Sequence, residues 1–298
     1  MGLVTPFRRL RAQKQSKLLR KAARTGATPT FPNLVCQVCT AEQMRSPEYL
    51  AWCDFLRCPN ETLHRKVWEY CYIVQLIKER LGFKEGLRGL GFGVGKDRLP
   101  ESFAALGCSV IATDQAPEAA EKQGWIASNQ YATTVEALNK LQICDKERFR
   151  ERVRFEIADM NAIPSEYRDF DFVWSACAFE HLGSIEAGLQ FVVNAMQCLR
   201  PGGWAVHTTE FNLVSDERTI DNRPTVLFRR RDLEELGRRL TALGPTPLPF
   251  NFHAGGDAID HHVDVPPYPR SPHLRLLISG YAATSIGIAV QKQNADKS

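Results

Sequence analysis

The sequence predicts an α/β fold with a doubly wound, mostly parallel sheet. From Gly86 onward, short apolar runs alternate with helical segments, which is the pattern of βαβ units. A glycine-rich turn, Gly91-Phe92-Gly93-Val94-Gly95, follows the first of these runs. We expect strands at residues 87–91, 109–113, 153–158, 170–175 and 204–209, and a terminal pair of strands at 246–252 and 282–290.

Three longer segments have apolar residues at helical spacing. Residues 62–81 predict a helix that leads to the first strand, residues 185–199 predict a helix stopped by Pro201 and Gly202, and residues 231–243 predict a helix that ends at Gly244. The predicted organisation is a flexible basic arm (1–30), a helical extension (31–85) and a main domain (86–298). The main domain has an insertion near 117–150 and a polar loop near 253–270.

Composition places the chain among ordinary globular proteins. Of its 298 residues, 44% are hydrophobic and 24% are charged. No apolar run approaches the roughly 18 residues that cross a bilayer, and no apolar segment follows the basic N-terminus as in a secretory signal. The nine cysteines are an odd number, and we interpret them as free thiols of a protein in the reducing cytoplasm.

Four of these cysteines suggest a second interpretation. Cys36 and Cys39 form a C-x-x-C pair, and Cys53 and Cys58 follow, a spacing that faintly resembles a four-thiolate zinc site. The second pair lies in a segment with helical apolar spacing. We therefore expect buried thiols and no metal.

The N-terminal arm is strongly basic. The rest of the chain has 30 cations against 34 acids. We predict a solvated, flexible tail; the alternatives are a helix packed on the domain, a peripheral contact with anionic membrane lipid or nucleic acid, and an organelle transit peptide. The eight cations of the arm, which has no acid, are Arg8, Arg9, Arg11, Lys14, Lys17, Arg20, Lys21 and Arg24.

The glycine-rich turn predicts a nucleotide-like ligand. Alternate glycines let the backbone turn sharply and approach a ligand closely. Asp114 ends the next predicted strand, 19 residues after Gly95, where a carboxylate can accept hydrogen bonds from ribose hydroxyls. The dinucleotide fingerprint requires a glycine where Lys96 stands. The spacing therefore favours S-adenosylmethionine, which has no pyrophosphate, over a nicotinamide cofactor.

Several segments between residues 86 and 215 together resemble the class I S-adenosylmethionine-dependent methyltransferases, particularly the type 11 branch. The resemblance implies a Rossmann-like, seven-stranded sheet with an antiparallel last strand. It implies donor contacts from the glycine turn, with Asp114 on the ribose and Asp159 and Met160 on the adenine. The segments are Gly91-Phe92-Gly93-Val94-Gly95, Asp114, Asp159-Met160, Phe170-Asp171-Phe172-Val173-Trp174-Ser175 with Glu180-His181-Leu182, and Leu199-Arg200-Pro201-Gly202-Gly203; Ser175 is included among the expected donor-binding residues.

The sequence departs from the family pattern at two places. Gly89 stands where the family commonly has an acid, which leaves the contact to the methionine amino group of the donor without a residue. The 44 residues between Asp114 and Asp159 exceed one crossover helix, so an insertion is expected there, in which Trp125 and Gln130 either touch the donor or simply pack.

Two residues are candidates for a general base. His181 follows the fourth strand and Glu210 follows the fifth, at the sheet edge where ligands bind in such folds. A histidine that titrates near neutral pH suits the deprotonation of a hydroxyl. The alternative is that Glu180 and His181 only cap or orient the next helix. We predict that His207, within a strand, belongs to the core.

The polar loop is treated as solvated structure. It contains His253, Asp257, Asp260, His261, His262 and Asp264, which could alternatively bind a polar substrate or a divalent metal. The nearby string Asp264-Val265-Pro266-Pro267-Tyr268 is one residue too long for the N/D-P-P-Y/F loop of amino-methylating nucleic-acid enzymes and lies after the wrong strand. We therefore expect no nucleic-acid partner.

The sequence thus predicts an enzyme that uses S-adenosyl-L-methionine to methylate a hydroxyl of a polar small molecule or sugar, with a cell-surface glycan precursor as one candidate. The alternatives are N-methylation of a small molecule or protein, and a non-catalytic subunit that binds the donor.

Overall fold

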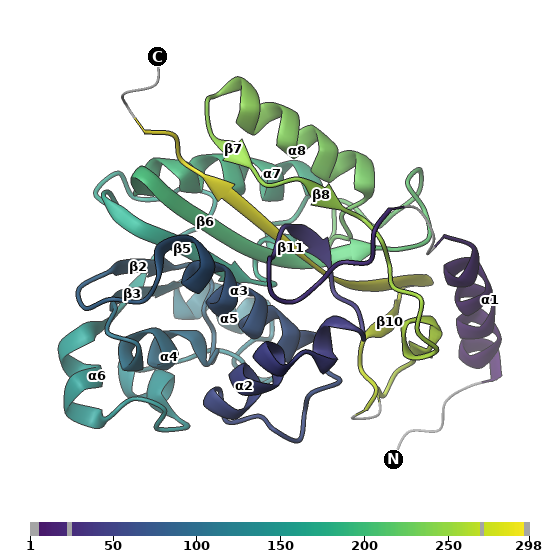
Figure 1. Cartoon of the computed structure of the whole chain (residues 1–298), viewed down its shortest axis with the longest axis horizontal. Helices are drawn as coiled ribbons and strands as arrows, with labels where there is room; N and C mark the ends of the chain where they lie inside the picture. The colour runs from purple at the N-terminus through teal and green to yellow at the C-terminus, as the bar shows by residue number, and fades with distance from the viewer. Residues whose placement is uncertain (1–5, 23–25, 269–270, 295–298) are drawn as a thin grey trace.

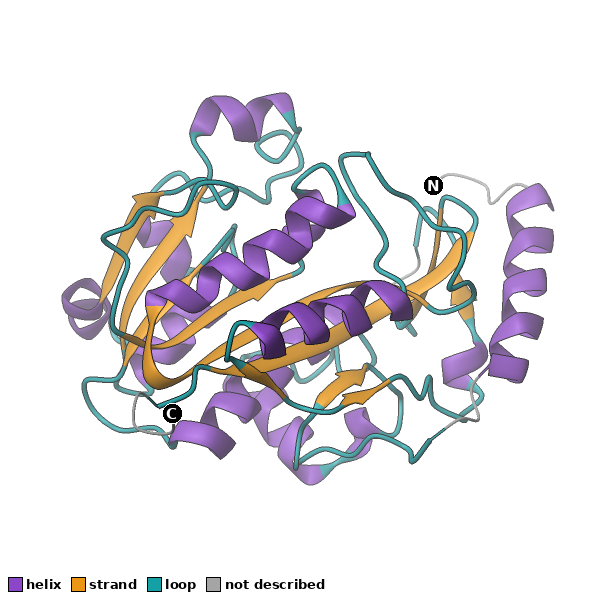
Figure 2. Ribbon diagram, turned by 90° about the horizontal axis from the view of Figure 1, so that it is seen from above, coloured by secondary structure: helices purple, strands orange, loops and turns teal. Residues whose placement is uncertain are grey.

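The computed structural model describes residues 6–22, 26–268 and 271–294. Its centre is a single twisted sheet whose strands run in the order β4-β3-β2-β5-β6-β11-β1-β8 (Figure 1). Helices cover both sides of this sheet (Figure 2). The predicted fold class, a Rossmann-like doubly wound α/β fold, is confirmed.

The predicted strands form the middle of the sheet. From β4 to β6 all neighbouring strands are parallel, and β11 pairs antiparallel with β6 from Trp204 to Asn212. The apolar runs explain this arrangement because a parallel sheet covered on both faces is buried throughout. These strands are β2 (Arg88–Gly91), β3 (Ser109–Asp114), β4 (Val153–Ile157), β5 (Phe170–Ala176), β6 (Leu199–Asn212) and β11 (Tyr281–Gln291).

The predicted count of seven strands is lower than the eleven of the described sheet. The strand predicted at 246–252 is divided into two strands of two residues each, β7 (Thr246–Pro247) and β8 (Phe250–Asn251). The strands that were not predicted are two to four residues long and lie where loop segments add short ladders near β11. They are β1 (Cys36–Val38), β9 (Val263–Asp264) and β10 (Arg275–Ile278). β1 brings the N-terminal extension into the sheet by pairing with β11 and β8.

Helix ends follow local chemistry. His64 caps α3 at its N-terminus, and Gly82, with φ of 63°, ends it. Ser184 caps α7, which turns into a short 3₁₀ helix before β6 begins. The α-helices after α1 are α2 (Pro47–Phe55), α3 (Arg65–Leu81), α4 (Leu99–Ala105), α5 (Pro117–Lys122), α6 (Lys146–Arg152), α7 (Ile185–Ala195) and α8 (Arg230–Ala242); the 3₁₀ helices are η1 (Gln43–Arg45), η2 (Val135–Asn139), η3 (Phe179–His181), η4 (Met196–Cys198) and η5 (Ile259–His261).

The basic arm contains helix α1 (Pro6–Ala22), where the sequence predicted a flexible tail. The helix lies at the edge of the molecule near β10 (Figure 1) and contacts β9, β11 and η5. Leu19 is buried, and the Ser16 hydroxyl donates to the carbonyl of His261 at 2.5 Å. The arm has one apolar anchor, which a count of charges does not reveal. Arg24 of the arm lies outside the described residues.

The four cysteines of the zinc alternative are free and buried. The Cys36 thiol exchanges hydrogen bonds with the backbone of Ala289 in β11, whereas the Cys53 thiol lies 4.0 Å from that of Cys71. Cys36 and Cys39 therefore pack against the sheet, whereas Cys53 and Cys58 pack against α3. No helix of the described chain is both long and apolar enough to span a membrane.

Candidate functional site

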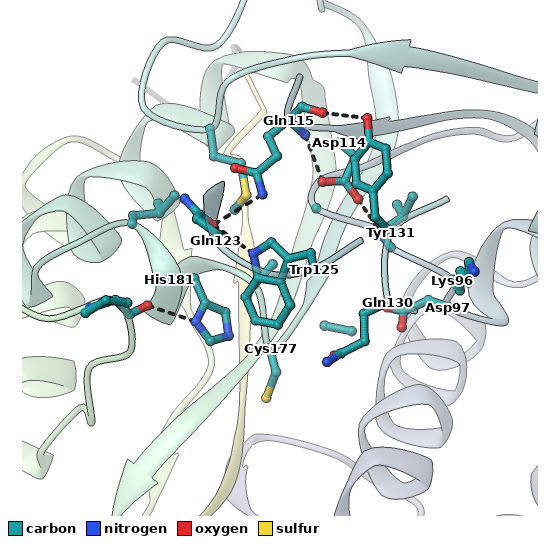
Figure 3. A pocket seen from close by; sticks show the side chains of 18 of the residues that line it. Lys96, Asp97, Asp114, Gln115, Gln123, Trp125, Gln130, Tyr131, Cys177 and His181 are labelled. Atoms are coloured by element: carbon teal, nitrogen blue, oxygen red, sulfur yellow. Dashed lines mark hydrogen bonds between the residues drawn. The ribbon is translucent and has the colours of Figure 1, made fainter. Parts of the chain in front are cut away.

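A cavity of about 790 Å³ opens at the carboxyl ends of β2, β3 and β5. This is the edge where ligands bind in doubly wound sheets. Side chains from the glycine turn, the insertion, η3 and helix α3 meet around it (Figure 3). It is lined by residues 93–97, 114–115, 123, 125, 129–131, 158–161, 176–178, 181–183 and 222–224, with Lys66 and Tyr70 of α3.

The glycine turn forms the floor of this cavity. Gly93 and Gly95 have φ of 58° and 51°, a left-handed conformation that favours glycine. A Cβ on Gly93 would lie 2.7 Å from that of Ala178, and one on Gly95 would lie 2.7 Å from the carbonyl oxygen of Gln130. Gly91 lies outside the cavity lining, and its missing side chain makes room for Trp174 in the core.

Asp114 ends β3 and reaches the cavity with a nearly buried side chain. Its two oxygens accept from the backbone N–H groups of Gly95 and Gln115, both at 2.8 Å. Burial raises its pKa, and these two hydrogen bonds oppose that rise. Because each carboxylate oxygen has a second lone pair, Asp114 holds the glycine turn and keeps acceptor capacity for ribose hydroxyls.

Asp159 and Met160 line the cavity at the end of β4, as the sequence predicted. Asp159 accepts from the backbone N–H of Asn161, which fixes this turn. Ser175 is placed differently from its predicted role: it is fully buried outside the lining and lies 2.8 Å from His207 Nδ1. His207 is a core residue, and burial lowers its pKa to about 3.

The insertion covers one side of the cavity. Trp125 and Gln130, which the sequence suggested as donor contacts, both line it (Figure 3). The indole N–H of Trp125 donates to Gln123, and the Tyr131 hydroxyl donates to the carbonyl of Gln115 at 2.8 Å. The Tyr131 bond ties the insertion to the end of β3, where Gln115 also donates its side-chain amide to Gln123.

Helix α3 contributes two cavity residues, Lys66 and Tyr70, and both contact Asp97. The sequence did not indicate this arrangement. Tyr70 donates its hydroxyl to Asp97 at 2.7 Å, and the Lys66 ammonium lies 3.8 Å from the same carboxylate. Burial raises the pKa of Asp97 to about 6, although Lys66 lowers it. Asp97 is the second residue after the glycine turn. Gly89, where the family acid would stand, has no room for a side chain because the Phe172 ring fills the space.

His181, a predicted base, points into the cavity beside Trp125 (Figure 3). Its ring lies edge-on to the indole with centroids 4.8 Å apart. Nδ1 is 3.0 Å from the carbonyl oxygen of Pro224 and 3.1 Å from the Thr225 hydroxyl. The carbonyl can only accept, so the tautomer with the proton on Nδ1 makes the Pro224 hydrogen bond, whereas the hydroxyl serves either tautomer. Burial lowers the pKa of His181, and the Pro224 hydrogen bond opposes this. In the tautomer that bonds to Pro224, the neutral ring presents the lone pair of Nε2.

Glu210, the other predicted base, belongs to a buried group that we call the charge cluster: Arg65, Glu69, Cys177, Glu180 and Glu210. Arg65 binds Glu210 at 2.5 Å and Glu69 at 3.2 Å. Cys177, with φ of 50° at the end of β5, donates its thiol to Glu69 at 3.1 Å and lines the cavity. Glu210 itself lies behind the lining.

The predicted polar loop has a structural role. Asp260 is buried, binds the buried Arg275 at 2.9 Å and accepts from the backbone N–H of Ala41. Asp264 accepts from His273 Nδ1 at 2.8 Å. Asp264 belongs to the predicted loop and to β9, whereas His273 lies beyond the loop, so residue spacing did not predict this pair. Among the described residues, Cys177, Glu180 and Glu210 form a group of three side chains of the kinds that can bind a metal ion.

Residues 90–207 match the family model described as a methyltransferase domain. The matched segment runs from β2 into β6 and includes the glycine turn, Asp114 and His181. No curated protein sequence matches the chain.

Solved structures with similar folds are distant in sequence. A 1,6-didemethyltoxoflavin-N1-methyltransferase from Burkholderia thailandensis is 18% identical, with a TM-score of 0.45 over 99% of this chain and 93% of that one. A putative sarcosine dimethylglycine methyltransferase from Galdieria sulphuraria is 13% identical, with a TM-score of 0.47 over 78% and 87%. An arsenic(III) S-adenosylmethionine methyltransferase from Chlamydomonas reinhardtii is 16% identical, with a TM-score of 0.42 over 78% and 74%.

Proposed function

We propose that this chain, which carries a class I S-adenosylmethionine-dependent methyltransferase domain matched over residues 90–207, methylates a hydroxyl oxygen of a polar small molecule or sugar. The observation that carries the proposal is His181, whose proton on Nδ1 leaves a basic Nε2 facing the cavity. An oxygen acceptor needs such a base because it loses its proton as the methyl group arrives.

The cavity residues fit S-adenosylmethionine. We assign Asp114 to the ribose hydroxyls and Asp159, Met160 and Trp125 to the adenine, since all four line one side of the cavity. The cavity volume of about 790 Å³ leaves space for an acceptor beside the donor.

Asp97 is our candidate for the amino group of the donor. The chain has no acid at position 89, and Asp97, two residues after the glycine turn, has a carboxylate that lines the cavity. Lys66, which lines the same wall, is placed to attract the donor's carboxylate. Helix α3 would then complete the donor site from outside the segment that matches the family.

The donor supplies a methyl group already made electrophilic by its sulfonium. In the proposed reaction the acceptor oxygen forms a bond to that methyl carbon, the C–S bonding pair stays on sulfur, and the hydroxyl proton passes to His181 Nε2. Pro224 keeps the imidazole oriented through Nδ1, so the protein contributes alignment and proton removal.

A nitrogen acceptor is the second candidate. The charge cluster beside the cavity contains three glutamates. Their carboxylates would attract an amine acceptor in its cationic form. A neutral amine would need no strong base, so His181 would then matter less. The proposed glycan precursor remains a prediction from the sequence.

An acceptor screen with labelled S-adenosylmethionine tests the proposal. Polyols, sugars, phenols and amines are incubated in parallel, and mass spectrometry of the product locates the methyl group. Methylation of a hydroxyl that is lost in His181→Ala supports the proposal. Methylation of a nitrogen, with turnover insensitive to His181→Ala, contradicts it.

A further inference from the structure

Three glutamates of the charge cluster each have a buried carboxylate oxygen that lacks a hydrogen-bond partner among the described residues. Glu69 Oε2 lies 3.3 Å from the Lys66 ammonium, whereas no ion pair of the described residues reaches Glu180 Oε1 or Glu210 Oε2. A carboxylate oxygen of each lies within 4.8 Å of the other and of the Cys177 sulfur. Burying an unpartnered carboxylate oxygen is costly. At such a separation two ionised carboxylates repel each other, and one proton on either of them relieves this repulsion.

We propose that Glu180 and Glu210 share one proton, and that the single negative charge they keep stabilises His181 after it has taken the acceptor's proton. The second half of this statement rests on the proposed function of His181 as the base. The pair acts through His181, so both glutamates are positioning residues in this scheme.

The surrounding charges leave the pair short of positive charge. On α3, Arg65 and Lys66 face Glu69, and Lys66 also faces Asp97. These two cations therefore serve four carboxylates once Glu180 and Glu210 are included. An excess of buried negative charge favours protonation of the carboxylate that is least well compensated.

Glu69 is not that carboxylate. Its Oε1 accepts from Arg65, from the Cys177 thiol and from the Ser285 hydroxyl of β11. Burial alone would raise the pKa of Glu69, but the cations Lys66 and Arg65 hold it below its ordinary value. The proton therefore belongs to Glu180 and Glu210, where burial raises each pKa to about 7.

The remaining neighbours do not replace the proton. Thr209 of β6 donates its hydroxyl to Glu180 Oε2 and leaves Oε1 unpartnered. Tyr268, which faces the pair from beyond β9, donates its hydroxyl to the carbonyl of Leu277. Arg65 binds Glu210 Oε1 and leaves Oε2 unpartnered.

The pair is close enough to His181 to matter electrically. Glu180 and His181 are consecutive residues of η3, and the charge of Glu210 raises the pKa of His181 against the opposing effect of burial. A pair with one negative charge therefore stabilises the imidazolium that forms when the acceptor is deprotonated. The proton taken from the acceptor stays on His181 until solvent removes it.

Infrared spectroscopy of the full chain tests the shared proton without any acceptor. The C=O stretch of a protonated carboxylic acid is resolved from that of ionised carboxylates, so the wild type should show one such buried group at pH 7. Glu180→Gln and Glu210→Gln should each remove it, because the remaining glutamate loses its like-charged neighbour. Glu166→Gln, at an exposed glutamate, is the matched control and should leave the band unchanged.

The link to His181 is read by NMR of ¹³C-labelled histidine, with His181→Ala assigning the signal. In the double variant Glu180→Gln/Glu210→Gln, which removes the shared charge, the pKa of His181 should fall by roughly 0.5 to 1 pH unit, the size expected for a nearby charge in a partly solvated site. Each single variant keeps one negative charge on the remaining glutamate and, like Glu166→Gln, should leave this pKa nearly unchanged. Glu180→Gln/Glu210→Leu gives the same readout should the first double variant fail to fold.

Each outcome tests a separate part of the proposal, either the shared proton or its effect on His181. Absence of the acid band between pH 6 and 7, or one equivalent of bound metal by elemental analysis, would overturn the shared proton. A band that behaves as expected while the His181 pKa stays fixed in the double variant would overturn the stabilising role. Since neither readout uses turnover, failure of His181 as the base would appear only in the acceptor assays.

Discussion

The two ends of the cavity are built in different ways. The proposed donor end consists of backbone turns and side chains at the ends of adjacent parallel strands, and Asp114 is held there by two backbone N–H groups. The proposed acceptor end consists of charged side chains, with Arg65 from α3, Cys177 from the end of β5 and Glu210 from β6.

This difference predicts different sensitivities. At the donor end the sheet itself fixes the geometry, so a substitution should weaken one ligand contact and leave the fold intact. At the acceptor end each charge compensates another one in a buried place, so a substitution should disturb either the proton balance or the stability of the whole domain. The predictions below probe this contrast.

Loss of the base should have the largest effect. His181→Ala is expected to lower turnover by roughly 10²- to 10⁴-fold, the usual contribution of a general base, with little change in donor affinity. Because burial lowers the pKa of His181, the base is unprotonated at neutral pH, and the wild-type rate should fall as pH drops below 6.5. Stopped assays with the acceptor found by screening measure both, and a variant with near-normal turnover would place the base elsewhere.

Loss of Arg65 should have the next largest effect, and this effect is on the stability of the fold. Arg65→Met leaves Glu69 and Glu210 without their guanidinium and is expected to cost about 3 to 5 kcal/mol of unfolding free energy. Arg45→Met, which breaks the exposed pair with Asp257, is the control and should cost at most about 1 kcal/mol. Urea denaturation compares the two. Equal costs would show that the acceptor end is no more dependent on charge than the surface.

The donor end should show a smaller and purely local effect. Asp114→Ala removes the proposed ribose acceptor and should weaken S-adenosylmethionine binding by roughly 1.5 to 3 kcal/mol in titration calorimetry. Asp54→Ala, at an exposed position on α2, should bind the donor normally. Unchanged donor affinity in a folded Asp114→Ala variant would contradict this assignment.

The donor end was also the more predictable part of the molecule. Periodicity and turn chemistry located the parallel strands and the cavity residues Gly93, Gly95 and Asp114, because each of these features is encoded within a few residues. Asp159 and Met160, which also line the cavity, were expected from the resemblance to the methyltransferase family. Ser175 and Gly91 follow the same motif, yet a strand alternates its side chains between faces and places Ser175 in the core.

The acceptor end was largely hidden from sequence analysis. His181 could be proposed from its place after a strand, but Arg65, Lys66 and Glu69 looked like the polar face of an amphipathic helix. Their meeting with Cys177 and Glu210 depends on packing between segments more than 100 residues apart. Helix α1 shows the same limit, since Leu19 and the hydrogen bonds of Gln15 and Ser16 attach a segment that is rich in basic residues.

The smallest expected effect concerns Asp97, where the two ends meet. If the Asp97 carboxylate holds the amino group of the donor, the donor binds well only when Asp97 is ionised. Burial raises the pKa of Asp97 to about 6, so donor affinity should change with pH around that value. Donor affinity should therefore be constant above pH 7 and fall by roughly tenfold as pH drops from 7 to 5, since each pH unit below the pKa reduces the ionised fraction about tenfold.

Asp97→Asn should remove this pH dependence and leave an affinity at pH 7 close to that of the wild type at pH 5. Glu101→Gln is the matched control, because Glu101 is buried nearby but bonds to the backbone N–H groups of Leu141 and Ile143 instead of facing the main cavity. Titration calorimetry with S-adenosylmethionine across the pH range measures the donor affinity of the wild type and of both variants. A wild-type affinity that stays constant from pH 5 to 7 would mean that the donor's amino group is held by backbone carbonyls, and the donor end would then be built from the main chain to an even greater extent than proposed.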